Sequence, residues 1–324
     1  MLKIGLLNIR KNTSGPKIFL NKLSYAIKKN SYAKVTNALL PFFDIAIYNS
    51  YARNFYGKKY ILRLDGLYFD IKNTLGLNKK LNGKIFYSIK NSSGVIFQSN
   101  FSKKLFEKFY GDISVVNTVI HNGGFTEFRK KVNHYQFEIP ERKIIVVAIA
   151  QWRRHKRLKE IVELYMELTQ KYKNLYLIVV GANAQMKGTD NIQYIPSLNQ
   201  VEVYSLLKQA DLMFHFSWLD NCPNSVVEAL CFRVPVLCTN QGGTRELVEI
   251  TKGGIVSEAD KKFNYEPVDL YNPPKPDMNV LYEDAVRLIE NIDFYKSQID
   301  TSMIDINNVA HKYVEFAKKI HSNK

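Results

Sequence analysis

Residues 220–230 have the sequence DNCPNSVVEAL, and this stretch decides how the rest of the chain is interpreted. It closely follows the apolar residues 212–216, which suit a buried strand. Pro223 favours the first turn of a helix, because its fixed φ fits there and its missing N–H is no loss. The stretch therefore predicts a strand, a loop and a helix that begins near Pro223, the arrangement that α/β proteins repeat.

The predicted start of this helix suits an anion. The backbone N–H groups of Asn224, Ser225 and Val226 would have no partners within the helix, and they lie at the positive end of its dipole. Glu228 shares a face with Asn224 and Ser225, so it can reach a polar group attached to the anion, such as a ribose diol. Asp220 lies before the helix and could contact the other end of the same ligand. The pattern predicts that two carboxylates bracket one diphosphate.

Length and strand pattern predict two α/β domains. At 324 residues the chain is longer than one hydrophobic core usually supports. Apolar runs that suit buried parallel strands alternate with helical patterns in both halves, and the polar segment 129–142 is the best linker candidate. We predict two doubly wound domains that face each other across a cleft, at residues 1–138 and 139–301. A final amphipathic helix is predicted within residues 302–324.

Other candidate residues follow the predicted strands, where the ligand crevice of an open α/β sheet lies. Gly15 precedes the first predicted helix and could approach a ligand closely. Asp65 follows the predicted strand at residues 59–64. Both are also ordinary turn residues, so local sequence leaves a purely structural role open.

A basic loop, residues 151–157 with the sequence QWRRHKR, joins the first strand of the second half to its helix. Five consecutive basic or potentially basic side chains at the mouth of the crevice could neutralise a diphosphate, because Arg offers a fork of donors and Lys a point charge. A solvated cationic loop is the simpler interpretation of the loop alone. The neighbouring anion site favours a binding role for Arg153 and Lys156. His155 is expected to be a loop residue.

The chain is strongly basic. Its 46 Lys and Arg residues against 30 Asp and Glu give a formal net charge of +16, which favours polyanionic partners. A composition rich in Lys, Asn, Ile and Tyr explains the same excess without any function. Nucleic-acid binding is not expected, because no zinc-finger spacing or aromatic RNA-binding motif supports it. A NAD-dependent oxidoreductase is disfavoured, since no G-x-G-x-x-G follows a strand.

The sequence favours a cytoplasmic protein. No run of about 18 uncharged apolar residues suits a membrane span, and the N-terminus lacks the order of a signal peptide. The three cysteines lack metal-site spacing and suit reduced packing residues. Contact with an anionic membrane is the alternative to a fully soluble protein, with lysines of the first half as candidates. They are Lys79, Lys80, Lys84, Lys103, Lys104 and Lys108.

Several motifs together resemble one family. The similarity is to the donor-binding signature of retaining glycosyltransferases of family 4. It is carried by D-x7-E-A-L at residues 220–230, by Pro235 and Val236, and by G-G-x-x-E-L-V at 242–248. The segment IHNG at 120–123 and the basic loop occur in the order of that family. The resemblance implies the GT-B fold, with two Rossmann-like domains and a C-terminal helix that crosses back to the N-terminal domain.

The resemblance also implies a reaction. A sugar would pass from a nucleoside diphosphate donor, UDP- or GDP-linked, to a hydroxyl of a glycan or lipid-linked acceptor, with retained configuration and with no metal or other cofactor. Glu228 would hold the ribose, the diphosphate would contact the start of the helix, and Ile195 would lie near the base. The donor-binding residues would be Gly15, Arg153, Lys156, Ile195, Asn224, Ser225 and Glu228. The catalytic residues would be Asp65, Arg153, Lys156 and Asp220.

Two positions differ from the family pattern. The family usually has Glu where this chain has Asp220, and many members have His where it has Asp65. A second hypothesis therefore stays open: a catalytically impaired protein of the same fold that binds nucleotide sugars or polyanions.

Overall fold

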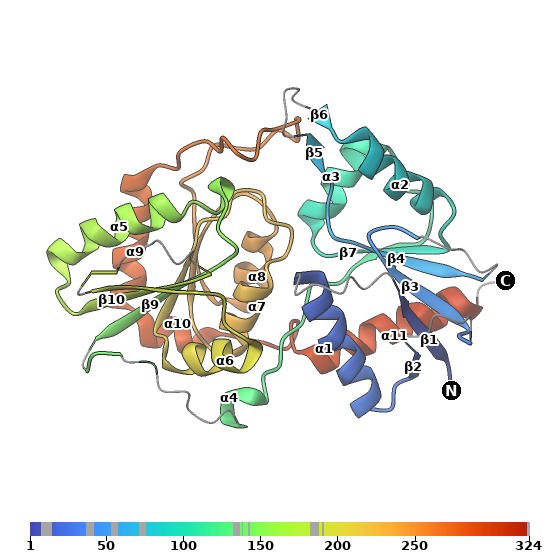
Figure 1. Ribbon diagram of the computed structural model, residues 1–324, viewed down its shortest axis with the longest axis horizontal. Coiled ribbons are helices and arrows are strands. Elements are labelled where there is room, and N and C mark those ends of the chain that lie inside the picture. Colours follow the sequence, from blue (N-terminus) through green and yellow to red (C-terminus); the bar gives the residue numbers. More distant parts are fainter. Residues whose placement is uncertain are drawn as a thin grey trace.

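The computed structural model describes residues 1–7, 15–36, 42–52, 58–70, 76–131, 137, 139–141, 143–181, 188, 189 and 191–322. Two α/β units lie side by side, each built on a parallel sheet of six strands (Figure 1). A short antiparallel pair, β5 (Phe69–Asp70) with β6 (Gly76–Leu77), is added to the first unit. The α/β class predicted from the sequence is confirmed.

The strands of the first sheet have the order β2-β1-β3-β4-β7-β8. They are β1 (Lys3–Leu7), β2 (Lys34–Thr36), β3 (Ile45–Asn49), β4 (Tyr60–Leu64), β7 (Gly94–Phe97) and β8 (Asn117–Val119). The helices that accompany them are α1 (Gly15–Lys29), α2 (Lys79–Lys90), α3 (Asn100–Tyr110) and the short α4 (Phe128–Lys131). The chain order reverses between β1 and β3, which is the topological switch point of this sheet.

The second sheet has the order β11-β10-β9-β12-β13-β14, so its switch point lies between β9 and β12. Its strands are β9 (Ile144–Ile149), β10 (Leu175–Val180), β11 (Ile192–Ile195), β12 (Leu212–His215), β13 (Val236–Thr239) and β14 (Gly254–Ser257). The helices are α5 (Leu158–Lys171), α6 (Gln200–Gln209), α7 (Asn224–Cys231), α8 (Thr244–Thr251), α9 (Met278–Glu290) and α10 (Ile292–Gln298).

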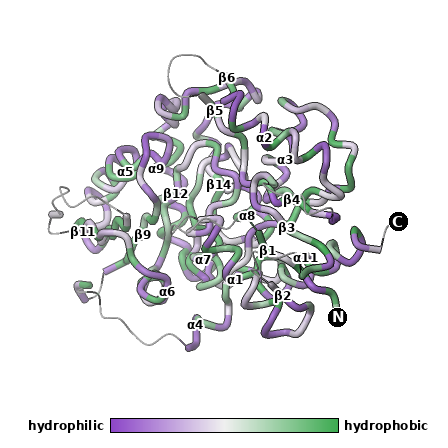
Figure 2. Tube along the Cα trace, turned by 45° about the vertical axis from the view of Figure 1, so that its right-hand side comes forward, coloured by the Kyte–Doolittle hydropathy of each residue, from purple (hydrophilic) through white to green (hydrophobic). Residues whose placement is uncertain are grey.

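The central strands are apolar because helices cover both of their faces. β10, LYLIVV, is buried at every position, as parallel strands between two helical layers require. In β9, Val146 and Ala148 belong to the core with α5 and α9, whereas Ile145 and Val147 belong to the core on the other face. In Figure 2 the hydrophobic residues are concentrated along the inner strands. No helix among the described residues is both long and apolar enough to cross a membrane.

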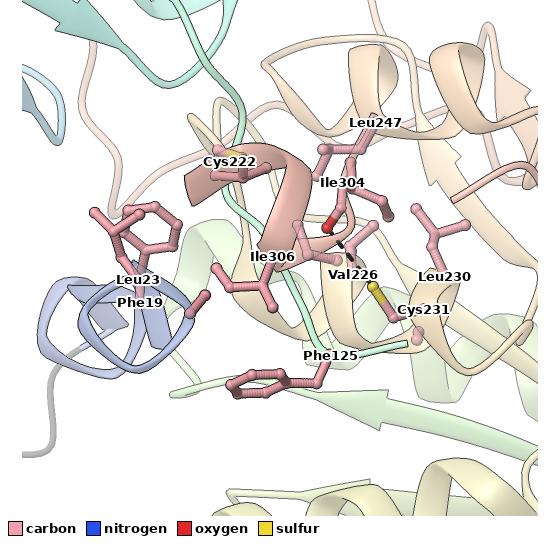
Figure 3. Packing of buried hydrophobic residues seen from close by; sticks show 14 of the residues in the cluster. Phe19, Leu23, Phe125, Cys222, Val226, Leu230, Cys231, Leu247, Ile304 and Ile306 are labelled. Carbon is pink, nitrogen blue, oxygen red and sulfur yellow. Dashed lines mark hydrogen bonds between the residues drawn. The ribbon is translucent and has the colours of Figure 1, made fainter. Parts of the chain in front are cut away.

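The final helix, α11 (Ile306–Ser322), returns to the first unit, as the GT-B resemblance implies (Figure 1). It packs against α1, where the rings of Phe19 and Tyr313 lie 5.8 Å apart. Figure 3 shows Phe19 of α1, Val226 of α7 and Ile306 of α11 in one apolar cluster. The first unit, the second unit and the final helix therefore share a core.

The predicted domain boundaries are not tested by these contacts. α4 ends at Lys131 and β9 begins at Ile144. The predicted boundary at residues 138 and 139 falls between them, and residue 138 lies outside the described residues. The divisions at 138 and 301 stay predictions.

Candidate functional site

Two loops meet at the switch point of the second sheet. The loop after β9 contains the short helix η1 (Arg154–Lys156), and the loop after β12 leads to α7. Lys156 from the first loop pairs with Asp220 from the second, and their side chains are 17% and 18% exposed. Nε2 of His215, the last residue of β12, lies 3.8 Å from Oδ2 of Asp220. The structure brings the predicted residues Lys156 and Asp220 together and adds His215, which the sequence analysis missed.

The surroundings of Asp220 keep its carboxylate ionised. Burial favours the neutral acid, but the Lys156 ammonium outweighs burial and holds the pKa of Asp220 well below its ordinary value. Burial also lowers the pKa of His215. Nε2 of His215 is buried and has no hydrogen-bond partner in the described part of the chain. The site therefore contains a charged pair beside a neutral imidazole.

The backbone of Asp220 rests on the glycine pair that follows β13. Gly242 has a φ of 89°, in the left-handed region that favours glycine. A Cβ atom there would lie 2.8 Å from the carbonyl oxygen of Asp220. The N–H of Gly243 donates to that same oxygen over 2.6 Å. Glycine is required at this contact because the two backbones touch directly.

The basic loop divides into exposed and buried residues. Arg153 and Arg154 are exposed at the mouth of the sheet. Arg157 is 1% exposed and pairs with both carboxylate oxygens of Asp260, over 2.8 and 2.7 Å. Arg157, one of the five side chains that the sequence offers to a diphosphate, therefore turns inward instead, where a buried guanidinium needs such a partner.

The starts of α7 and α1 face each other across the two units. Pro223 is the N-cap of α7, so the helix begins one residue after the predicted position. Nδ2 of Asn224 donates to the carbonyl oxygen of Gly15, the first residue of α1, over 2.8 Å. The N–H groups of Asn224 and Ser225 lie in the first turn, where no helical acceptor exists, and suit an anion. The predicted residues Gly15, Asn224 and Ser225 are thus neighbours.

Glu228 faces two helices of the interior. It is 6% exposed, and its Oε1 accepts hydrogen bonds from Lys22 of α1 and, over 3.0 Å, from Gln200 of α6. Lys22 lies on the buried face of α1. The sequence analysis did not identify Lys22, although a lysine among the apolar positions of a predicted helix is a usable signal. The predicted role of Glu228 at a ribose requires that Lys22 share this carboxylate.

Asp65 follows β4 and is held by four side chains of the first unit. It pairs with Arg63 and accepts hydrogen bonds from Asn49 over 2.5 Å, Ser50 over 2.8 Å and Gln98 over 3.0 Å. Asp65 is 21% exposed, whereas Arg63 is 1% exposed. Burial opposes the charge of Arg63, but Asp65 outweighs it and raises the pKa of the guanidinium. Both carboxylate oxygens of Asp65 are therefore occupied.

Asn122 connects this group to α7. Its Oδ1 accepts from Arg63 over 2.7 Å, and its Nδ2 donates to Oδ1 of Asn224 over 3.0 Å and to the carbonyl oxygen of Cys222 over 3.0 Å. Asn122 is 2% exposed. Asp65 and the start of α7 thus belong to one polar network that crosses between the units.

Glu246 of α8 makes a second polar contact between the units. It accepts hydrogen bonds from the N–H groups of Asn100 and Phe101 at the start of α3, over 2.8 and 2.6 Å, and from His121 over 3.1 Å. Burial favours the neutral acid, but these donors outweigh burial and lower the pKa of Glu246. A carboxylate at a helix N-terminus is stabilising.

Ile195 lies apart from this group. It ends β11, the outer strand, and its carbonyl oxygen accepts from the N–H of Gly181 over 3.0 Å. Its contact with a base stays a prediction. Within the described ranges, no group of three or more His, Cys, Asp or Glu side chains is arranged to hold a metal ion.

The second unit is similar to a known protein family. Residues 129–264 match the family described as Glycosyl transferases group 1. The matched segment contains η1, the Asp220 loop, α7 and the glycine pair. A search of curated protein sequences finds no match.

Solved structures of low sequence identity share the whole fold. Sucrose-phosphate synthase from Thermosynechococcus elongatus has a TM-score of 0.73 at 11% identity over 100% of both chains. HepE from Anabaena, in complex with UDP and glucose, has a TM-score of 0.65 at 13% identity over 98% of this chain and 100% of HepE. A glycosyltransferase from Rickettsia africae has a TM-score of 0.62 at 17% identity over 98% and 85%. The fold is GT-B, as predicted, and together with the family match it supports a glycosyltransferase.

Proposed function

We propose that the protein transfers a sugar from a nucleoside diphosphate sugar to an acceptor hydroxyl. The observation that carries this proposal is the Lys156–Asp220 pair, which lies at the switch point beside the start of α7, within the matched glycosyltransferase segment. A cation and a helix N-terminus suit a diphosphate, and an adjacent carboxylate suits sugar hydroxyls. The HepE structures that contain UDP-glucose, or UDP and glucose, support a UDP-linked donor, with a GDP-linked donor as the other option.

In this proposal each group has a separate task. Lys156 and Arg153 bind the diphosphate together with the N–H groups at the start of α7. Asp220 accepts hydrogen bonds from the sugar, and Glu228 accepts from the ribose once Lys22 shares its carboxylate. The ion pair with Asp220 keeps Lys156 at the position where the diphosphate arrives.

The reaction proposed is a transfer with retained configuration and without a metal. The bond between C1 of the sugar and the diphosphate oxygen breaks, and the acceptor oxygen bonds to C1 on the same face. The departing diphosphate takes the proton of the acceptor hydroxyl. Lys156, Arg153 and the start of α7 stabilise the charge that develops on the diphosphate, which is where preorganised charge has its largest effect. Asp65 would line the sugar side of the site.

The contacts of Glu228 and Asp65 favour a second candidate function. Both carboxylates already have cationic partners, Lys22 and Arg63. If these pairs persist with the donor bound, the protein binds a nucleotide sugar without transferring it.

Donor turnover separates these candidates. Purified protein is incubated with UDP-, GDP- and ADP-sugars, and released nucleoside diphosphate is measured by mass spectrometry, with ligand binding followed by thermal shift. We expect release from one donor, and a fall of about 100-fold in Lys156→Met. Lys159→Met, an exposed lysine three residues further along, is the matched control. Binding without release would favour the second candidate, and neither binding nor release would contradict both.

We further propose that the protein binds a glycan or lipid-linked acceptor at an anionic membrane surface. Exposed lysines lie on α2 and α3. Tyr87, which is also on α2, is 61% exposed. Lysines and an interfacial aromatic side chain suit anionic head groups. The exposed lysines are Lys79, Lys80, Lys84, Lys104 and Lys108. Sedimentation with phosphatidylserine vesicles at low salt should retain the protein, and equal retention on neutral vesicles would contradict the proposal.

A further inference from the structure

A loop of the second unit reaches the first unit on the side of the molecule away from α11 (Figure 1). Between β14 and α9, residues 261–274 form no helix or strand, and they extend to α3 and to the β5–β6 pair. We call this segment the bridging loop. The first unit is therefore contacted by α11 on one side and by the bridging loop on the other.

One buried side chain holds both ends of the bridging loop. Arg157 pairs with Asp260, immediately before the loop, and its Nη2 donates to the carbonyl oxygen of Pro274 over 2.6 Å. The N–H of Asp277 also donates to the carbonyl oxygen of Ala259 over 2.8 Å. Both ends of the bridging loop are thus fixed on the second unit, and these contacts direct the loop toward the first unit.

The middle of the bridging loop packs against the start of α3. The rings of Phe263 and Tyr265 lie 6.2 and 5.8 Å from the ring of Phe101. Phe69 of β5 and Leu105 of α3 belong to the same cluster, in which Phe263 and Phe101 are each 7% exposed. Buried aromatic side chains dominate the energy of contacts between protein surfaces.

The same loop contacts the two residues before Asp220 and the residue before the glycine pair that holds its backbone. Phe263 lies edge-on to Trp218 with 6.2 Å between ring centroids, and Leu219 packs against the aromatic cluster. The N–H of Phe263 donates to Oε1 of Gln241, the residue before the glycine pair, over 3.1 Å. Leu219 has a left-handed φ of 58°. This conformation costs a leucine about 1–2 kcal/mol, so surrounding contacts must hold it.

We propose that docking of the bridging loop on α3 positions Asp220, and that Phe101 and Phe263 are positioning residues of the site. The role of Asp220 toward a sugar rests on the proposed function, whereas the docking does not. The N–H of Phe101 also donates to Glu246 of α8 over 2.6 Å. The two units therefore make an aromatic contact and a polar contact at the same helix start, and the first unit sets the geometry of a carboxylate in the second.

The test compares three variants of the full chain. Phe101→Ala removes the aromatic contact from the side of the first unit, and Phe101→Leu keeps an apolar side chain there. Tyr271→Ala changes a residue of the same loop that is 41% exposed and serves as the matched control. If Phe101→Ala does not fold, Tyr265→Ala makes the same test from the loop.

Two measurements need no activity. Limited digestion with trypsin reports undocking through cleavage at Lys261 and Lys262, which are exposed where the loop begins. Hydrogen exchange of peptides that contain Gly243 reports whether its N–H still donates to Asp220. Where a donor is turned over, kcat and KM give a third measurement.

We expect Phe101→Ala to raise cleavage at Lys261 and Lys262 and exchange at Gly243 about tenfold each. We also expect kcat to fall about tenfold with donor KM changed less than about threefold, because the diphosphate contacts are unaltered. Phe101→Leu and Tyr271→Ala should stay close to wild type. Unchanged cleavage, or faster cleavage with unchanged exchange at Gly243, overturns the proposal. Wild-type protein that turns over no donor, with cleavage and exchange as expected, overturns the proposed function and leaves the docking supported.

Discussion

Lys22 of α1 and Glu228 of α7 form an ion pair that joins the two units inside the protein. Their side chains are 5% and 7% exposed, and Gln200 of α6 donates to the same carboxylate. The pair lies beside the apolar cluster that contains Leu23 and Val226 (Figure 3). Each charge depends on the other, because neither has bulk water as an alternative partner.

Removing Lys22 should therefore destabilise the fold strongly. Lys22→Met leaves the Glu228 carboxylate buried without its cation. The free energy of unfolding, measured by urea denaturation, should fall by about 3–5 kcal/mol. Lys29, the last residue of the same helix, forms an exposed pair with Glu127, and Lys29→Met should lose far less stability than Lys22→Met. The double variant Lys22→Met with Glu228→Leu should regain part of the loss. Equal losses of stability for Lys22→Met and Lys29→Met would show that the buried pair stabilises the fold no more than the exposed pair.

The Asp220 carboxylate should matter for turnover. Asp220→Asn keeps the shape of the side chain but removes the charge opposite Lys156. Donor turnover should fall about 100-fold or more, because charge placed in advance around the reacting groups has effects of that order. Asp112→Asn, at an exposed position before β8, is the control and should keep wild-type turnover. A fully active Asp220→Asn variant would remove Asp220 from the site.

The sequence predicted the fold because its signals are local and repeated. The apolar run in β10 and the Pro223 helix start depend on neighbouring residues, and both lie within one residue of their predicted positions. The Lys156–Asp220 contact could also be inferred from the sequence, since both residues follow strands that flank a switch point. The predicted catalytic and binding roles themselves stay predictions.

Other contacts between distant segments could not be predicted from the sequence. Lys22 and Glu228 are 206 positions apart, and Arg157 and Asp260 are 103 apart. Nothing in the local pattern of a basic loop distinguishes Arg157, which turns inward, from the exposed Arg153. Which of several like charges is buried depends on where a carboxylate from another element arrives, and that is decided by tertiary packing.

Gly242 should tolerate no side chain. Gly242→Ala would place a Cβ atom 2.8 Å from the carbonyl oxygen of Asp220 at a φ of 89°. We expect a loss of about 1–3 kcal/mol in the free energy of unfolding, together with reduced donor turnover, because the Asp220 backbone must move. Gly83→Ala is the matched control, since its Cβ meets nothing within 4 Å on α2. That change should raise stability by about 0.5–1 kcal/mol. A stable and active Gly242→Ala variant would contradict the close backbone contact.

His155 should make stability depend on pH between about 6.5 and about 4. Burial, followed by the charge of Lys156, lowers its pKa from 6.5 to about 4, and its buried Nδ1 has no partner among the described residues. Between these values the unfolded chain binds the proton more readily than the folded protein, so stability falls as the pH falls. His155→Gln cannot take up that proton, and its melting temperature should drop about 3 °C less than that of wild type between pH 7 and pH 4.5. His321→Gln, at an exposed position of α11, should follow the wild-type curve. Parallel curves for wild type and His155→Gln would mean that the ring is solvated in the folded protein.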